Sequence, residues 1–132
     1  LCHLEENAQV ICGDSLAALG TQSGRFDIIF LDPGNMDLVN DEYANNPGFF
    51  DSLRAVQEGQ VYTMPSTNAA GPNVTYLLIN AYYAGLTLYP EQFSDVRLED
   101  KAAEIMEMML GENFFDQMVE GGLYYGTITI GE

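Results

Sequence analysis

The side chains best suited to chemistry are polar groups that follow two short apolar runs. Asp32 and Asn35 come directly after the run FDIIFL at residues 26–31, in a turn of sequence Asp-Pro-Gly-Asn. Their carboxylate and amide groups are suited to hydrogen-bonding an organic ligand, and Met36 adds a soft apolar surface beside them. The alternative is that Asp32 only caps its own turn, because Asx side chains commonly bond the backbone two residues on.

A second polar group follows the next run, QVYTM at residues 60–64, which ends in Met64. Ser66, Thr67 and Asn68 carry hydroxyl and amide groups that can hydrogen-bond an organic ligand. In a parallel α/β sheet, ligands meet the loops at the carboxyl ends of the strands. Both loops are therefore candidate parts of one binding site, which includes Met64 at the end of the strand.

A long helix is predicted over residues 73–88, with Asn73 as its N-cap and Pro90 as its stop. The apolar residues that recur at spacings of three and four, and that we expect to form its buried face, are Val74, Leu77, Leu78, Ala81, Gly85 and Leu88. Free amide groups at its start can assist an anionic ligand. Tyr76, one turn inside, either reaches the same site or packs against the sheet.

No catalytic set is evident in the sequence. The single histidine is His3, and no Ser, Cys or Lys has the context of an activated nucleophile. Cys2, His3 and Cys12 form a weak metal-ligand trio that lacks a fourth partner at finger-like spacing. We therefore expect a binding protein that is not an enzyme and that uses no cofactor and no metal site of its own.

Length and charge narrow the classes further. The 132 residues, 47% of them hydrophobic, suit one domain spanning residues 1–132, and no apolar run approaches the roughly 20 residues of a transmembrane helix. Twenty acidic residues against four basic ones give a formal charge of −16, which disfavours DNA and RNA as partners. The acidity either keeps the surface soluble or complements a basic partner.

The order of elements predicts an α/β fold, a three-layer domain with a mostly parallel central sheet flanked by helices. Strands are expected over 26–31 and 60–64, both in the interior of the sheet. Helices are expected over 14–19, 47–56, 73–88, 99–110 and 113–119, with Gly111 as a C-cap. The methionines assigned to the core are Met106, Met108, Met109 and Met118.

One short stretch resembles the DNA amino-methyltransferases. The segments ICGDSLAAL and FDIIFLDPGN are similar to that family, whose D-P-P-Y tetrad holds a flipped base. Here the tetrad is Asp32-Pro33-Gly34-Asn35, which has no aromatic ring to stack on a base, and the chain has no glycine-rich cofactor loop. This enzyme class is kept as one alternative, and a cell-surface interaction domain without a ligand is kept as the other.

Three segments from about Phe26 to the end carry a second resemblance. They are FDIIFLD, then PGFFDSLRAVQEGQVYTMP, then NVTYLLINAYYAGLTLYPEQFSDVRLEDKAAEIMEMMLGENFFDQM. In this order they resemble the C-terminal lobe of the helical-backbone class of periplasmic binding proteins, which capture ferric siderophores, haem or cobalamin for ABC importers. The family's Gly-Gly-Glu-Asn-like stretch, whose Glu docks on the permease, has its nearest match at Leu4-Glu5-Glu6-Asn7.

The resemblance implies a substrate-binding component outside the cytoplasmic membrane, in the periplasm or as a lipid-anchored lipoprotein. Its partners would be a ferric siderophore or related metal chelate and the ABC permease, with Glu5 or Glu6 as the docking acid. An intact ferric chelate is coordinatively saturated, so the protein would grip the organic shell. One lobe supplies one wall of the cleft, so alone it is expected to bind weakly.

Overall fold

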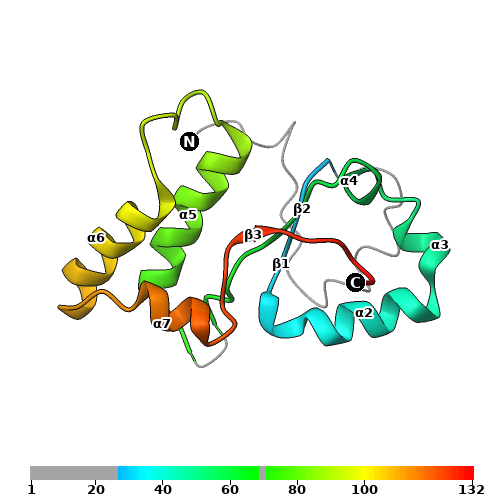
Figure 1. Cartoon of the computed structure of the whole chain (residues 1–132), viewed down its shortest axis with the longest axis horizontal. Helices are drawn as coiled ribbons and strands as arrows, with labels where there is room; N and C mark the ends of the chain where they lie inside the picture. The colour runs from blue at the N-terminus through cyan, green and yellow to red at the C-terminus, as the bar shows by residue number, and fades with distance from the viewer. Residues whose placement is uncertain (1–26, 69–70) are drawn as a thin grey trace.

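The computed structural model describes residues 27–68 and 71–132 (Figure 1), which form an α/β arrangement around a small mixed sheet. Strand β1 (Ile29–Leu31) pairs in parallel with β2 (Val61–Thr63), and β3 (Gly126–Thr127) pairs antiparallel with β2 on its other side. The α/β class is therefore confirmed. Among the described strands, β2 is central and β1 lies at an edge, so the prediction of two interior strands is wrong for β1.

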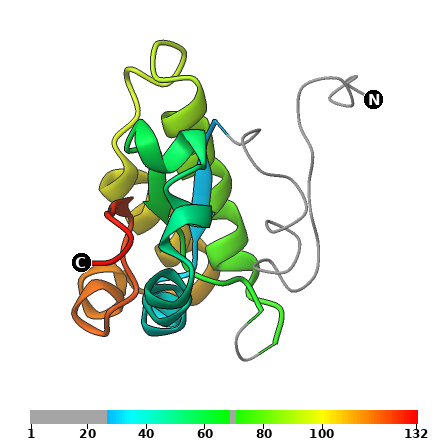
Figure 2. The ribbon, with the colours of Figure 1, turned by 90° about the vertical axis from the view of Figure 1, so that its right-hand side faces the viewer.

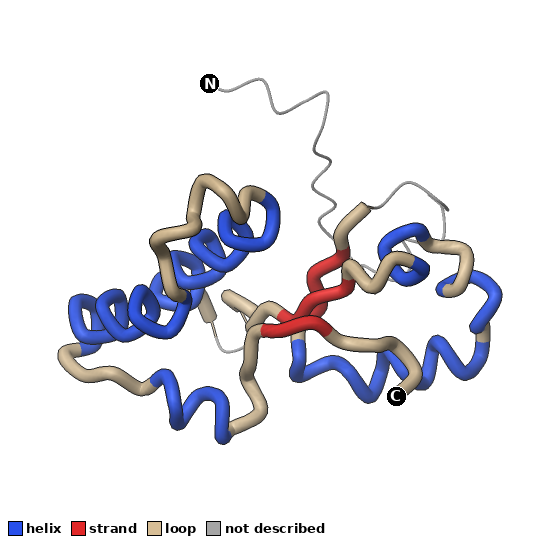
Figure 3. Tube along the Cα trace, turned by 45° about the horizontal axis from the view of Figure 1, so that its top comes forward, coloured by secondary structure: helices blue, strands red, loops and turns tan. Residues whose placement is uncertain are grey.

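Helices flank these strands on two sides. Figure 1 shows α2 (Met36–Asn45), α3 (Pro47–Phe50) and α4 (Arg54–Gln57) on one side. The helices α5 (Val74–Leu88), α6 (Leu98–Leu110) and α7 (Phe115–Glu120) lie on the other side, and Figure 3 shows the strands between the two groups. Over the two described ranges, none of these helices is long and apolar enough to cross a membrane.

The buried apolar side chains form two separate groups, one for each set of helices. The sheet cluster consists of Ile29, Val39, Phe50, Leu53, Ala55, Val61 and Ile130. The helix cluster consists of Ile79, Ala102, Ile105, Met106 and Met118. The last described stretch passes from one to the other, because Leu123 and Tyr125 pack on the helix cluster while Ile128 packs on the sheet cluster.

The segment after β1 is more helical than its sequence suggests. A 3-10 turn, η1 (Pro33–Asn35), leads directly into α2, where the sequence had predicted only a loop reaching Met36. Val39 is the buried residue of α2, and Met36 and Tyr43 pack against the sheet cluster. With so few apolar positions among acidic and amide residues, α2 has a weak helical signature that was missed.

The helix predicted over residues 47–56 is broken in two, which is a correction. Leu53 stands between α3 and α4 with an extended backbone (φ −77°, ψ 127°) and is fully buried in the sheet cluster. Just before it, the Ser52 hydroxyl donates a hydrogen bond of 2.6 Å to the Phe49 carbonyl. Burial of the Leu53 side chain therefore requires the chain to leave the helix, and this outweighs the regular apolar spacing.

The two long helices agree with prediction in their ends. The Asn73 side chain accepts a hydrogen bond of 3.0 Å from the Tyr76 amide at the start of α5, and Gly111 ends α6 with φ 83°. This left-handed conformation favours glycine. Gly85 is required for a different reason, because a Cβ there would lie 2.6 Å from the ring of Phe93.

The buried face of α5 differs from the predicted one. Thr75, Ile79, Asn80 and Tyr83 are buried, whereas the predicted core residues Val74, Leu77, Ala81 and Leu88 are exposed. The Tyr83 ring packs edge-on against Phe30 and Tyr62 of the strands, with centroids 6.0 and 6.4 Å apart. These aromatic contacts set the rotation of the helix about its own axis, and the apolar spacing alone did not reveal it.

The assignment of four methionines to the core is correct for two of them. Met106 and Met118 are buried, but Met108 is 69% exposed and Met109 is 44% exposed. Successive helical positions are 100° apart, so Met108 leaves the buried stripe of α6, and Met109 lies one turn beyond the last buried position. The end of α6 therefore exposes apolar side chains, including Met108 and Met109.

Replacing Leu53 tests the break between α3 and α4. Leu53→Ala is expected to reduce the free energy of unfolding by about 2–5 kcal/mol, because a fully buried leucine leaves a cavity in the sheet cluster. The matched control is Leu38→Ala on α2, where the side chain is 61% exposed and the change should stay within about 0.5 kcal/mol. Urea unfolding measures both. Equal effects for the two leucines would contradict the position of Leu53.

Candidate functional site

The first candidate loop is held by its own hydrogen bonds. One carboxylate oxygen of Asp32 accepts a bond of 3.1 Å from the Gly34 amide, and the other accepts one of 3.3 Å from the Asn35 side chain. Asp32 is partly buried and Asn35 is exposed. The structure therefore shows Asp32 as the cap of its own turn, with both oxygens in use, while Met36 packs on the sheet cluster.

The second candidate loop leaves β2 along a fixed path. The Met64 amide donates to the Leu31 carbonyl at 2.8 Å, which is the last backbone bond between the two strands. The Ser66 hydroxyl accepts from the Asn68 amide at 3.3 Å, and the Asn73 amide donates to the Thr67 carbonyl at 2.8 Å. These local bonds bring the start of the loop close to the start of α5.

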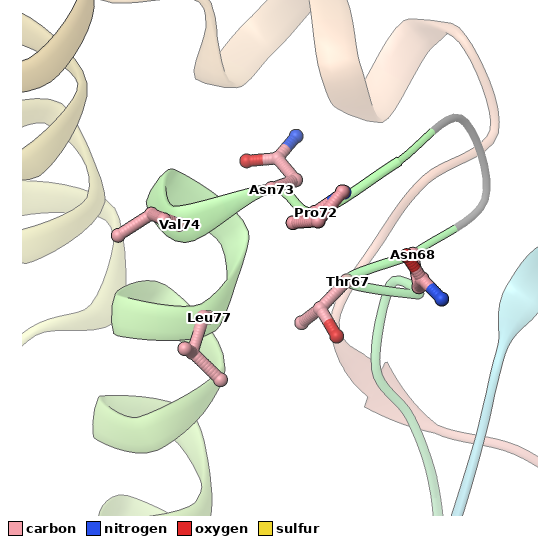
Figure 4. Close-up of a pocket in the computed structure, with 6 residues that line it drawn as sticks. All are labelled: Thr67, Asn68, Pro72, Asn73, Val74 and Leu77. Carbon is pink, nitrogen blue, oxygen red and sulfur yellow. The ribbon is translucent and has the colours of Figure 1, made fainter.

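This loop and the first turns of α5 border an open hollow of about 300 Å³, which we call the loop hollow (Figure 4). Its lining residues are Thr67, Asn68, Pro72, Asn73, Val74 and Leu77. Figure 4 shows Thr67 on the loop side of the hollow and Leu77 on the helix side. Of the predicted site residues, Thr67 and Asn68 are therefore brought together with Asn73.

The other predicted residues do not line the loop hollow. Those placed elsewhere are Asp32, Asn35, Met36, Met64, Ser66 and Tyr76. Four lining residues were missed as site residues, namely Pro72, Asn73, Val74 and Leu77, and of these Asn73 had been predicted only as the N-cap of α5. Val74 and Leu77 had been assigned to the core, and the one available signal was that α5 contains no charged residue to mark a solvent face.

The lining of the loop hollow is uncharged and mixed in polarity. Thr67 supplies a hydroxyl, Asn68 and Asn73 supply amides, and Val74 and Leu77 supply apolar surface. The Asn73 side-chain oxygen is already used as the cap of α5, which leaves its NH₂ group as a donor. Such a lining suits an organic ligand that offers carbonyl or hydroxamate acceptors and some apolar surface.

Tyr76 lines a second hollow, which shares Asn73 with the first. Tyr76 packs against the helix cluster, whereas the packing alternative had placed it against the sheet. This second hollow, which we call the helix hollow, has a volume of about 320 Å³. Its lining residues are Asn73, Thr75, Tyr76, Met106, Leu110, Phe114, Gln117 and Met118. Asn73 is the one residue that lines both hollows.

Metal ligands do not gather in the described part of the chain. Within residues 27–68 and 71–132 no group of three or more His, Cys, Asp or Glu side chains could hold a metal ion. Cys2, His3 and Cys12 lie outside the described residues, as do Glu5, Glu6 and the helical turn predicted over 14–19. Predictions made for those residues stay predictions.

Comparison with known proteins gives no family assignment. Neither a scan against protein-family models nor a search of curated proteins finds a match. The function therefore has to be inferred from the residues that line the hollows and from the resemblance in the sequence.

A buried hydrogen-bond network connects the second loop to α5 and to Tyr125. The Asn80 side chain donates to the Pro65 carbonyl at 2.8 Å and accepts from the Tyr125 hydroxyl at 2.7 Å. Burial, followed by the nearby phenols of Tyr76 and Tyr83, raises the pKa of Tyr125 well above its ordinary range. The Tyr125 hydroxyl therefore stays protonated and keeps donating to Asn80.

Removing the Tyr125 hydroxyl tests this network. Tyr125→Phe is expected to lower the free energy of unfolding by about 1–3 kcal/mol, because the oxygen of Asn80 is left buried without a donor. Tyr124→Phe is the matched control, since Tyr124 is exposed and should change stability by less than about 0.5 kcal/mol. Thermal or urea unfolding gives both values. A Tyr125→Phe variant as stable as the control would contradict the network.

Alkaline pH should destabilise the fold through the same tyrosine. The pKa of Tyr125 is raised in the folded state, so the unfolded chain releases its proton first, at about pH 10. The contribution to stability is complete below that pH and is lost as the pH rises toward the folded pKa. Urea midpoints measured from about pH 8 upward should fall beyond about pH 10, and less steeply in Tyr125→Phe. Equal slopes in the two proteins would contradict this assignment.

Proposed function

We propose that the chain is the C-terminal lobe of an extracytoplasmic solute-binding protein that captures a ferric-siderophore-type chelate for an ABC importer. The observation that carries this function is the loop hollow directly after β2, at the carboxyl end of a parallel strand pair. Open α/β sheets place ligands at such positions. The resemblance of three ordered segments to the helical-backbone binding proteins supports the same function.

The chemistry of the lining fits the organic shell of a chelate. A siderophore wraps iron in its own oxygen ligands, so its outer surface offers amide or hydroxamate oxygens and methylene groups. Thr67, Asn68 and Asn73 can donate to those oxygens, while Val74 and Leu77 can pack on the methylenes. Since the chain carries a formal charge of −16, we infer that the chelate is neutral or cationic, unless a second lobe supplies basic residues.

One lobe provides one wall of the cleft. In this proposal the parallel pair of β1 and β2 is part of a three-layer lobe with a mostly parallel sheet, and a first lobe closes over the loop hollow from the opposite side. Glu5 or Glu6 would dock on the permease. Most of the binding free energy comes from burying the chelate between two walls, so half a cleft is a weak binder.

Affinity for a defined chelate tests the two-wall arrangement. Ferrioxamine B should bind the isolated chain no better than about millimolar and the intact two-lobed protein at about micromolar, a difference of ~4 kcal/mol. Tyrosine fluorescence quenching measures both, with haem and cobalamin titrated in parallel. Binding by neither form to any of the three chelates would overturn the transport function and favour an interaction domain without a ligand.

Substitutions in the lining test the site separately. In the two-lobed protein, Thr67→Val and Asn68→Ala should each weaken chelate binding by about tenfold, because each removes a hydrogen-bonding group from a desolvated cleft. Thr127→Val on β3 is the matched control, since Thr127 is exposed and does not line the hollow. If both lining variants bind as tightly as this control, the loop hollow is not the ligand site.

A further inference from the structure

The helix hollow combines a buried floor with an exposed apolar rim. Its floor is formed by the buried side chains of Thr75, Met106 and Met118. On the rim, Leu110 is 55% exposed and Phe114 is 40% exposed. A concave apolar surface with protruding apolar residues is typical of a surface that another molecule covers. It shares only Asn73 with the loop hollow, and its role does not depend on the proposed ligand.

The charged residues in the segment that supplies half of the helix hollow's lining are all acidic. The segment from 107 to 120 supplies much of the lining and contains four acidic residues and no Lys or Arg, namely Glu107, Glu112, Asp116 and Glu120. Glu107 lies one helical turn before Leu110, so the two side chains are neighbours on the surface of α6. On the other side, α5 carries no charged residue at all. The largely apolar lining from α6 and α7 is therefore interspersed in sequence with acidic residues and with no basic one.

The C-terminal end of α6 adds to the negative charge of these acidic residues. Its last turn contains no basic residue, and Gly111 caps it through one backbone bond of 3.0 Å to the Glu107 carbonyl. The C-terminal end of a helix carries a partial negative charge that Lys or Arg side chains normally offset. At α6 no basic residue of the last turn supplies this offset.

We propose that the helix hollow is the docking site for a basic amphipathic helix of a partner protein. One large apolar residue of that helix enters between Leu110 and Phe114 and rests on Met106 and Met118, whose flexible side chains adapt to its shape. Its Lys or Arg side chains lie against Glu107 and the end of α6. A second copy of this acidic chain, or an anionic membrane, would meet repulsion at the same surface.

A synthetic peptide tests this docking on the full chain. The probe is a fluorescently labelled leucine–lysine peptide of about five helical turns, with its leucines on one face. Fluorescence anisotropy should show saturable binding that weakens at least about tenfold in Leu110→Ser and in Gln117→Lys, which adds a positive charge to the lining. Leu38→Ser is the matched control, because Leu38 is equally apolar and exposed but lies on α2.

The peptide sequence separates docking from simple charge attraction. A scrambled peptide of the same composition should bind at least about tenfold more weakly, since it has no continuous apolar face. Equal binding of both peptides, or unchanged binding to Leu110→Ser and Gln117→Lys variants with normal circular dichroism, would overturn the docking site. So would a dimer in sedimentation that Leu110→Ser dissociates, or flotation with phosphatidylglycerol vesicles, since each assigns the hollow to another occupant.

Discussion

The buried amide of Asn80 is the interaction on which the arrangement of the site depends. It joins the loop after β2, through Pro65, to helix α5, which contains Asn80 itself. It also joins both to the closing segment, residues 123–132, through Tyr125. An amide removed from water is costly unless both of its ends are paired, and here both are. The network therefore selects one position for α5 relative to the loop, and the loop hollow exists because that position is fixed.

The described part of the chain has two small apolar clusters and a short three-stranded sheet, in place of one large core. The three short strands lie between the two groups of helices, and Figure 2 views them from the side of α3. Beside the two clusters, Tyr83 of α5 contacts Phe30 and Tyr62 of the strands. Tyr83 also lies 4.9 Å from Tyr125, between ring centroids. Aromatic rings are suited to this junction because they bury a large area with few rotatable bonds. Both hollows lie beside the start of α5, whose rotation this junction sets.

Local signals in the sequence were sufficient for β1 and β2, though not for β3, and for the ends of α5 and α6, where Asn73 and Gly111 act as caps. They were not sufficient for α2, because a helix that buries little beyond Val39 has almost no periodicity. Local signals were also insufficient for part of the site. Thr67 and Asn68 follow a strand and could be predicted, whereas Val74 and Leu77 belong to a helix whose buried face is chosen by tertiary aromatic contacts.

Both apolar clusters include residues of the closing segment, so their packing is completed late in the synthesis of the chain. Residues 123–132 contribute Tyr125 to the network beside the helix cluster, pair through β3 with β2, and end with Ile130 in the sheet cluster. The helix cluster is therefore completed by Leu123 and Tyr125 and the sheet cluster by Ile128 and Ile130, which are translated after the other members of each cluster. Contacts of such long sequence separation are slow to form, so both clusters depend on late contacts for their full packing.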